Sequence, residues 1–554
     1  MRQPDGGGGL APVLKALVSR KVSLDHCIII AVTLAVLARI LWVASAPTVA
    51  IAFRSTDDAY YYLNVARNAV RGNGLTFDGI NTTNGFHPLW MLCLLLIYGI
   101  FDPGSSASFQ AVFSLVALIA GLNCWFAYRA ALCVADRPAA ATSIALLLVA
   151  PFASAFLNGL ETGLLVLFLL VLFEAMVRCD LASTRTRFRE DMLLGLLLSL
   201  VFLSRLDSMF HIASVLGFVV WRAVRDHGVG VGLVSALLKF VRASIPPILL
   251  VLPYLLWNTV AYGHAVPISG RLKSSFPAIN FDPSRIGNLH TLFGTVQILF
   301  AAAGFLALLL MRSSGDHPTA GRGRKLVVVF WVGCVLHFLH GLFFMPWAAH
   351  WWHYASYVPV TLLVSAMLLD DITARVGRRT ALIGGVAATT ALLVAVTWYV
   401  DARIRGLHHG PWYAASLWIR DHLPANAVVG MTDAGLVGYF CERPTVNLDG
   451  VINSYAYQLA LRDHKLADFL RNCGVTHIAD YEVRYREGRE VIRLPARLYK
   501  APGGAIVATP QAEVYRSEPY PRRFPKTGEV RFIVWDINKV QIVDDARHLF
   551  LGPP

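Results

Sequence analysis

The chain has 554 residues, of which 56% are hydrophobic types and only 15% are charged, and its net charge is +14 at pH 7. Soluble domains carry nearer a quarter of charged residues, so the composition excludes an ordinary soluble protein and indicates a polytopic membrane protein. Most of the Lys and Arg lie in short loops between apolar segments, which is typical of topogenic charge and does not indicate nucleic-acid binding.

Apolar segments long enough, or nearly long enough, to cross a bilayer run through the first four hundred residues. They are predicted at 26–48, 109–128, 139–157, 161–177, 192–203, 208–221, 240–261, 290–311, 325–345, 355–369 and 380–400. We therefore expect an α-helical polytopic membrane protein with about 11 transmembrane helices. The first of these segments shows no clear small-residue cleavage site, so we do not expect a cleavable signal.

The segment 88–101 is apolar but has only 14 residues, so its length does not show whether it crosses. If it lies along the membrane surface, 21 Lys and Arg fall in cytoplasmic stretches and seven in short outer loops. If it crosses and 192–221 forms one fused span, the stretches 129–138 and 178–191 move to the outer side, and their six Arg are then against the positive-inside rule. The charge distribution thus favours a surface helix, a cytoplasmic N-terminus at 1–25 and a C-terminal part on the outer side.

The first outer loop, 49–108, begins with two adjacent carboxylates, Asp57 and Asp58. Two like charges this close repel each other, and partial burial penalises both, so the pair is most useful where a polar or positive ligand binds. Later in the loop, His87 precedes Pro88, which predicts an extended residue followed by a helix.

Charged residues also interrupt the apolar segments further along. Glu161 falls at the outer start of a span, where negative charge is favourable at a helix N-terminus. Arg205 and Asp207 separate two short spans, and their plainest interpretation is an ion pair. A substrate-binding role for these three residues is the alternative.

Two later outer loops carry further polar residues. Arg271 and Lys273 are cations on the side where few are expected, and they suit either a lipid headgroup or a phosphate-bearing substrate. His350, His353 and Tyr354 lie beside two tryptophans; aromatic belts at membrane interfaces are common, but the histidines are less expected.

The remaining part, 401–554, is polar and contains many prolines, which predicts a mixed α/β domain of ordinary size. Eleven crossings place it on the same side as Asp57. The expected elements are a helix at 412–422 and strands at 427–431, 475–478 and 530–534.

Eight cysteines occur without CxxC spacing, so neither a zinc site nor a redox motif is indicated. Cys441 and Cys473 fall in the polar C-terminal part and can pair if it faces an oxidising compartment. The acids show no metal-ligand spacing; we expect no required cofactor, and a divalent metal is compatible but not indicated.

If these acids, cations and histidines meet, they form a cavity at the membrane surface with carboxylates on one wall and cations on another. Such a cavity suits a substrate with a phosphate leaving group and an acceptor hydroxyl. A carboxylate takes the hydroxyl proton as general base, and Arg and Lys stabilise the charge on the departing phosphate.

The motifs resemble the GT-C superfamily of membrane glycosyltransferases, and the resemblance covers about 26–400. It rests on the stretches 57–60, 84–90, 159–162, 205–207 and 267–273, with a weaker echo in 432–435 and 447–453. Together they are similar to terminal arabinofuranosyltransferases, and the general plan is similar to protein O-mannosyltransferases and lipid A aminoarabinose transferases.

The resemblance implies polyprenyl-phosphate sugar donors, surface helices in the first outer loop and an acidic residue of that loop as base. That residue is Asp57 or Asp58, and the mannosyltransferases favour the first acid of such a pair. His353 and Tyr354 stand where many relatives have Arg-Tyr, which gives Arg271 and Lys273 more weight in recognition of the donor phosphate.

The expected function is an inverting transfer of a sugar from a polyprenyl phosphate to an extracytoplasmic glycan, lipid or protein of the cell envelope, in a multi-pass protein of the inner membrane. The alternative is a transporter or flippase of lipid-linked sugars, which needs polar residues at the bilayer midplane and usually internal repeats. A scaffold without activity requires that the acid pair be solvated and inert.

Overall fold

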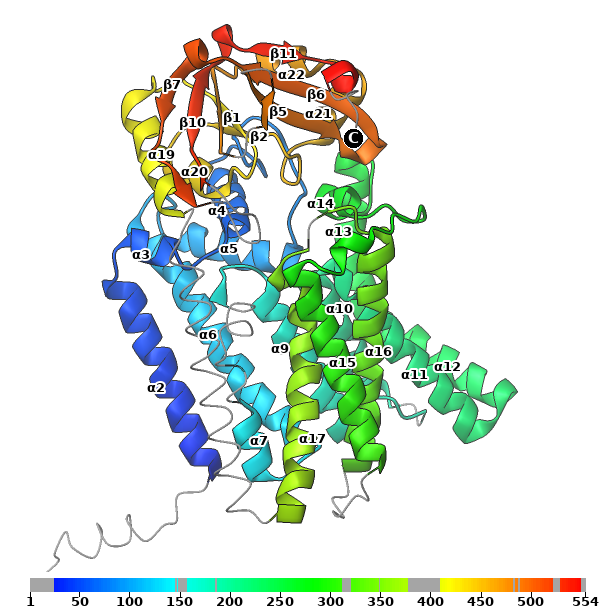
Figure 1. Ribbon diagram of the computed structural model, residues 1–554. Coiled ribbons are helices and arrows are strands. Elements are labelled where there is room, and N and C mark those ends of the chain that lie inside the picture. The colour runs from blue at the N-terminus through cyan, green and yellow to red at the C-terminus, as the bar shows by residue number, and fades with distance from the viewer. Residues whose placement is uncertain are drawn as a thin grey trace, which may run out of the picture.

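The structure is a computed structural model and describes residues 24–144, 147, 157–184, 187–310, 320–347, 349–376, 409–481, 484–486, 489–521 and 529–549. They form a bundle of long helices that carries a mixed α/β domain at one end (Figure 1). We call this end of the bundle the outer end.

The bundle consists of apolar helices that run along its length. They are α2 (Leu24–Ser45), α6 (Ser106–Ala131), α9 (Thr162–Arg178), α10 (Phe188–Ser204), α11 (Met209–His227), α13 (Ile245–Tyr262), α15 (Leu289–Leu310), α16 (Ala320–Phe344) and α17 (Val358–Val376). Within the described ranges, seven helical segments are long and apolar enough to cross a membrane. The protein is therefore a multi-pass membrane protein.

The predicted number of eleven crossings stays a prediction. Helix α7 (Arg137–Ile144) covers only the start of the predicted span 139–157, and much of that segment lies outside the described residues. The predicted span 380–400 lies outside them entirely.

One predicted span differs from the structure. The segment 240–261 is not one helix, because α12 (Val229–Ala243) ends before Ser244 and α13 starts anew with two prolines in its first turn. Proline lacks the N–H that would continue α12, so the chain changes direction there. Helix α12 was expected to be loop, and it exposes apolar side chains such as Val231 and Leu237.

The first outer loop folds into short helices at the outer end, namely α3 (Thr48–Ala52), α4 (Asp57–Val70) and α5 (Pro88–Ile100). Helix α5 is the predicted surface helix, and it lies across the ends of the bundle helices (Figure 1). Trp90, Leu94 and Tyr98 on it are buried while Leu92 and Leu96 are exposed, as expected for an interfacial helix with one packed face.

The C-terminal domain is the predicted α/β domain. Its main sheet has the strand order β2-β1-β3-β10-β7, and the first three strands are parallel. The strands are β1 (Val429–Met431), β2 (Thr445–Asn447), β3 (His477–Asp480), β7 (Glu513–Arg516) and β10 (Ile533–Asp536). The helices are α19 (His409–His422), α20 (Gly435–Phe440), α21 (Tyr455–Arg462) and α22 (Leu466–Asn472).

A second, antiparallel sheet has the order β11-β6-β5-β4. Its strands are β4 (Arg484–Arg486), β5 (Arg489–Ala496), β6 (Ala501–Ala508) and β11 (Gln541–Val543), and β8 (Tyr520–Pro521) pairs separately with β9 (Glu529–Val530). The expected helix at 412–422 is confirmed as α19. The strands expected at 427–431 and 475–478 correspond to β1 and β3, and the one at 530–534 is divided between β9 and β10.

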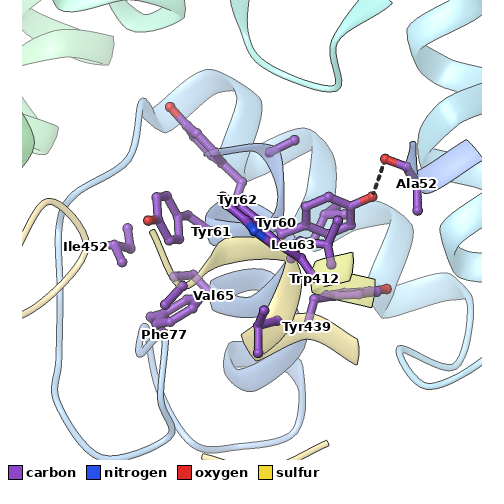
Figure 2. Packing of buried hydrophobic residues seen from close by; sticks show 14 of the residues in the cluster. Ala52, Tyr60, Tyr61, Tyr62, Leu63, Val65, Phe77, Trp412, Tyr439 and Ile452 are labelled. Atoms are coloured by element: carbon purple, nitrogen blue, oxygen red, sulfur yellow. Dashed lines mark hydrogen bonds between the residues drawn. The ribbon is translucent and has the colours of Figure 1, made fainter. Parts of the chain in front are cut away.

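The outer loop and the C-terminal domain share one hydrophobic core. Tyr60 of α4 is fully buried, and its ring lies 5.5 Å from the ring of Tyr439 in α20 (Figure 2). Trp412 of α19 belongs to the same cluster. Buried aromatic side chains contribute several kcal/mol each, so this packing fixes α4 against the C-terminal domain.

The disulfide considered from the sequence is not formed. Cys441 and Cys473 are both free and buried. The Cys441 sulfur contacts the hydroxyl of Thr445 at 3.4 Å, and the Cys473 sulfur accepts a hydrogen bond from the side chain of Asn81 at 3.4 Å.

Candidate functional site

The adjacent carboxylates of the first outer loop begin helix α4, where the helix dipole stabilises negative charge. Asp57 is buried, and its carboxylate accepts hydrogen bonds from the N–H groups of Gly435 (3.0 Å) and Leu436 (2.7 Å). These N–H groups lie in the first turn of α20 and have no partner within that helix. Asp57 therefore caps α20 and holds the C-terminal domain on α4.

The surroundings of Asp57 are acidic. Burial raises its pKa well above the ordinary value, and the charge of Asp433 raises it further. A carboxylate that satisfies two backbone N–H groups cannot turn to a substrate without leaving them unpaired. This geometry gives Asp57 a structural role in holding α20. The expectation from the sequence that Asp57 is the general base stays a prediction.

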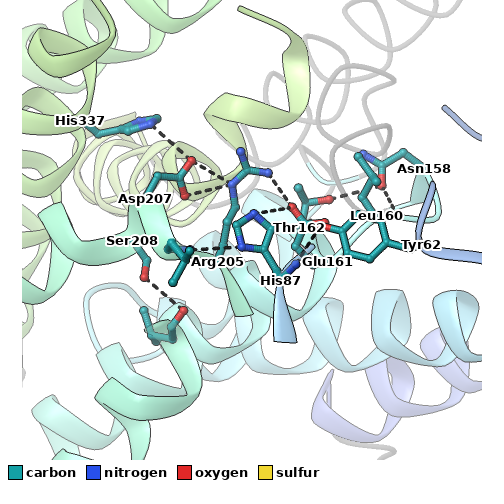
Figure 3. A network of polar contacts seen from close by, with 12 residues as sticks. Tyr62, His87, Asn158, Leu160, Glu161, Thr162, Arg205, Asp207, Ser208 and His337 are labelled. Atoms are coloured by element: carbon teal, nitrogen blue, oxygen red, sulfur yellow. Dashed lines mark hydrogen bonds and ion pairs between the residues drawn. The ribbon is translucent and has the colours of Figure 1, made fainter. Parts of the chain in front are cut away.

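Helix periodicity separates the two carboxylates. Residues four apart share a helix face, so Asp57 is grouped with Tyr61 and Asp58 with Tyr62. Tyr61 donates a hydrogen bond to Asp449 of the C-terminal domain at 3.2 Å. Tyr62 lies beside Glu161 of the bundle (Figure 3). Helix periodicity therefore puts the half-buried Asp58 on the same face as Tyr62, and its charge also reaches Tyr61.

A buried charged network lies on that side, with Arg205 at its centre (Figure 3). The Nε of Arg205 is 2.9 Å from both carboxylate oxygens of Asp207, and its Nη1 donates to Glu161 at 2.7 Å. His337 of α16 approaches Asp207 at 3.6 Å. The ion pair that the sequence suggested is present, and we call these four side chains, together with His87, the Arg205 network.

The backbone places Arg205 there. Arg205 is extended (φ −164°, ψ 124°) between α10 and a short turn of helix at Leu206–Ser208. Its side chain therefore does not follow the helical positions of α10. The N–H of Leu206 donates to Nδ1 of His87 at 3.4 Å, which leaves Nε2 of His87 to carry the proton toward Glu161, 3.7 Å away. His87 is therefore held in one tautomer by two elements.

The two cations of the outer loop before α15 diverge, because they are two residues apart in the short helix α14 (Ile268–Lys273). Lys273 lies within electrostatic reach of His87 and His353, so it belongs beside the Arg205 network. Arg271 instead lies over the ring of Tyr455 in α21, 5.9 Å from its centroid. Of the two cations, the structure brings only Lys273 toward the network.

His353 lies within electrostatic reach of Lys273 and Arg205, and one of its ring nitrogens has no hydrogen-bond partner among the described residues. Its Nδ1 accepts a hydrogen bond from the backbone N–H of His350 at 2.8 Å, while its buried Nε2 has no hydrogen-bond partner among the described residues. Buried polar atoms are nearly always paired, so this nitrogen suits a bound ligand. His350 stacks on Trp352 at 4.5 Å, and the ring of Tyr354 lies 6.4 Å from that of His337.

The C-terminal domain adds carboxylates that the sequence indicated only through the weak echo in 432–435 and 447–453. Asp433 and Asp449 follow the parallel strands β1 and β2, at the edge where open α/β sheets bind ligands. One oxygen of Asp449 accepts hydrogen bonds from Tyr61, from Asn447 at 3.0 Å and from the N–H of Asp433 at 3.1 Å. Burial and the charge of Asp433 raise the pKa of Asp449 to about 6.

Within the described ranges, no three His, Cys, Asp or Glu side chains converge as metal ligands would. The expectation that no metal is required stays a prediction.

The fold of this multi-pass membrane protein thus combines surface helices in the first outer loop, polar side chains gathered at the outer end of the bundle and a C-terminal α/β domain. The fold is shared with ArnT from Cupriavidus metallidurans, solved bound to undecaprenyl phosphate. That similarity has a TM-score of 0.50 at 12% identity and covers 91% of this chain and 97% of ArnT. At this identity the likeness establishes the fold alone.

Two further similarities are to the oligosaccharyltransferase of Archaeoglobus fulgidus. One is to AglB in complex with an inhibitory peptide and a dolichol-phosphate, with a TM-score of 0.45 at 14% identity, covering 77% of this chain and 66% of that chain. The other is to the form tethered to an acceptor peptide, with a TM-score of 0.45 at 13% identity. Here the match spans 65% of the archaeal chain, slightly less than two thirds.

Residues 400–522 match a family described as a domain of unknown function, DUF8728. No curated protein matches the chain.

Proposed function

We propose that the protein is a glycosyltransferase that moves a sugar from a polyprenyl-phosphate donor to a hydroxyl group of an extracytoplasmic acceptor. The observation that carries the proposal is that Tyr62 of α4 lies beside Glu161 of the Arg205 network, because Asp58 precedes Tyr62 by four residues and shares its helix face. A carboxylate and several cationic or neutral donors from distant loops then share one region. The fold shared with ArnT, solved bound to undecaprenyl phosphate, supports a lipid-linked donor.

In the proposed reaction the acceptor hydroxyl oxygen attacks the anomeric carbon of the donor sugar. Asp58 takes the hydroxyl proton as general base, and the bond between the anomeric carbon and the phosphate oxygen breaks. The polyprenyl phosphate leaves with the bonding electrons. A single displacement inverts the anomeric configuration.

Cations beside the network stabilise the leaving phosphate. Lys273 supplies a mobile ammonium group, and Nε2 of His353 supplies a buried nitrogen without a hydrogen-bond partner in the described part of the chain. Arg205 is held by two carboxylates, so it acts mainly by orienting Glu161 and Asp207 toward sugar hydroxyl groups. Asp57 and the network residue His87 position these groups and do not contact the reacting atoms.

The test uses the full chain in lipid nanodiscs with polyprenyl-phosphate sugars and a cell-envelope acceptor extract, and it measures released polyprenyl phosphate. General-base removal costs about 10²–10⁴-fold, so Asp58→Asn is expected to lose at least ~10²-fold in rate. Asp57→Asn is expected to lose rate and thermal stability together. Asp102→Asn, an exposed outer-loop aspartate, is the matched control with no loss.

Full activity in Asp58→Asn would remove the basis of the proposal. Movement of labelled lipid across reconstituted vesicles without release of polyprenyl phosphate would instead support the flippase alternative.

A further inference from the structure

A cavity of about 190 Å³ opens near the outer ends of α15 and α16, beside the loop that follows α14. A cavity of about 150 Å³ is known to accommodate one benzene ring, so this one has room for a single six-membered or five-membered ring with substituents. It does not include any residue of the Arg205 network.

The lining of the cavity is amphipathic. Asp282, Arg285, Asn288 and Thr291 supply a carboxylate, a guanidinium, an amide and a hydroxyl group on its polar part. Phe338 and Leu342 of α16 supply its apolar part. A polyprenyl chain has no group that could pair with the polar side chains, so burying them beneath it would cost free energy. A sugar ring has polar hydroxyl groups at its rim and apolar C–H groups on its faces, and both parts of the lining match it.

An aromatic side chain completes this match. Trp347 lines the cavity, and the guanidinium of Arg497 from the C-terminal domain lies 4.4 Å from the centroid of its ring. This cation–π contact holds the indole from the side of the C-terminal domain. A fixed indole offers a flat apolar surface to the C–H face of a sugar at low entropic cost, since it has only two side-chain torsions.

The cavity lies close to the Arg205 network. Tyr354 lines it, and the ring of Tyr354 is 6.4 Å from the ring of His337, which in turn approaches Asp207 at 3.6 Å. One aromatic layer therefore separates the cavity from the charged groups. A ring bound in the cavity would lie beside the proposed reaction centre and outside it.

We propose that this cavity is a subsite for a sugar ring of the acceptor, next to the ring that receives the new bond. The assignment of the ring to an acceptor rests on the proposed function. The binding of a sugar ring in the cavity is independent of the proposed function.

The chain offers a variant that fills the cavity without removing a contact. Gly341 lies in α16 and lines the cavity, and a Cβ atom added to it would meet no atom within 4 Å. Gly341→Leu should therefore occupy the cavity and, by helix propensity, favour α16. Gly217→Leu is the matched control, because Gly217 is an exposed helical glycine in α11 with equally open surroundings.

The probes are methyl α-D-arabinofuranoside and methyl α-D-mannopyranoside, and their binding to the full chain in nanodiscs is measured by saturation-transfer difference NMR. We expect at least one glycoside to bind, at least ~10-fold weaker binding to Gly341→Leu, and unchanged binding to Gly217→Leu. Trp347→Ala should weaken binding similarly, and Trp347→Phe should retain part of it. In a transfer assay, Gly341→Leu should raise KM for the acceptor and leave KM for the donor unchanged.

Failure of both glycosides to bind the wild-type chain, or equal binding to Gly341→Leu, would overturn the proposal. So would loss of undecaprenyl phosphate binding in Gly341→Leu, because the cavity would then belong to the lipid. Glycoside binding that depends on Gly341 in a chain without transfer activity would refute the proposed function and leave the sugar subsite standing.

Discussion

Asp57 and Asp58 are neighbours in sequence, yet the rotation between adjacent positions of a helix gives their side chains different surroundings. Asp57 is buried against the N-terminus of α20, where two N–H groups satisfy its carboxylate. Asp58 is half-buried and shares a helix face with Tyr62, four residues later. Adjacent residues in a helix point about 100° apart, so a pair of acids at this position can serve two purposes at once.

Arg205 offers a prediction at the scale of one residue. Arg205→Gln leaves the buried carboxylate of Glu161 and the half-buried carboxylate of Asp207 without their cation, which costs about 3–5 kcal/mol. We expect a large drop in thermal stability of the detergent-solubilised chain. Arg205→Lys should recover part of it, since an ammonium group cannot reproduce the fork that reaches both partners.

The matched control is Arg225→Gln, which removes an exposed ion pair with Asp226 and should cost at most about 1 kcal/mol. Equal thermal shifts for Arg205→Gln and Arg225→Gln would contradict a buried network at Arg205.

At the scale of elements, the contact between α4 and α20 connects the bundle to the C-terminal domain. Gly435 is central to it, because a Cβ atom there would lie 2.1 Å from the backbone oxygen of Asp57. Such an approach is possible only for glycine. The two helices therefore touch through backbone and carboxylate, with Tyr60 and Tyr439 packed beside them.

Gly435→Ala should force these helices apart and cost about 1–3 kcal/mol of stability, the range for overpacking. We expect faster limited proteolysis of the C-terminal domain and a lower transfer rate. Gly410→Ala in α19 is the control, because a Cβ atom there meets nothing within 4 Å. Unchanged proteolysis of Gly435→Ala would show that the contact does not hold the domain.

A second contact of α4 with the C-terminal domain, between Tyr61 and Asp449, predicts a pH dependence. The pKa of Asp449 is raised from its ordinary value to about 6, first by burial and then by Asp433. Between about pH 4 and pH 6 the unfolded chain has lost a proton that the folded chain retains, so stability falls as pH rises through this window and is level above it. Since Asp449 is half-buried, we expect a change on the order of 1–2 kcal/mol.

The measurement compares thermal unfolding of the wild-type chain and Asp449→Asn at pH 4.5 and pH 7. The wild type should lose more stability than the variant between these values, while Asp463→Asn, an exposed aspartate paired with Arg462, should behave as the wild type. A wild type that gains stability relative to Asp449→Asn on going to pH 7 would contradict the raised pKa.

At the scale of the whole molecule, hydropathy and charge predicted the fold class, the surface helix α5 and the α/β domain on the side of the outer loops. The break between α12 and α13 was missed, although two prolines after Ser244 carried the signal. Helix α12 was missed because its basic residues were expected in a cytoplasmic stretch between two spans. Lys239, one of these residues, is in fact buried against Asp191 at 2.5 Å.

The candidate site was predictable only in part. Unusual polar residues could be found one by one, and Glu161, Arg205 and Asp207 do meet. The sequence could not show that Arg271 turns to Tyr455 while Lys273 turns to the network, because both directions suit a cation at a membrane surface. Nor could it show the cap that Asp57 makes, since Gly435 lies hundreds of residues away.

The orientation predicted from the basic loops is also testable. Cys179 is an exposed native cysteine at the end of α9 opposite to the C-terminal domain (Figure 1), and Asp468→Cys places one on the surface of that domain. A membrane-impermeant maleimide should label Asp468→Cys in intact cells and Cys179 only after permeabilisation. The reverse pattern would place the proposed site on the cytoplasmic side.

The central claim is that a lipid phosphate binds between the Asp58 face of α4 and Lys273. Its most direct test is a cryo-electron microscopy structure of the full chain in nanodiscs with added undecaprenyl phosphate. The account predicts phosphate density within hydrogen-bonding distance of Lys273 or His353 and within one sugar length of Asp58. Phosphate density at the opposite end of the bundle, or beyond the reach of a single sugar from Asp58, would contradict it.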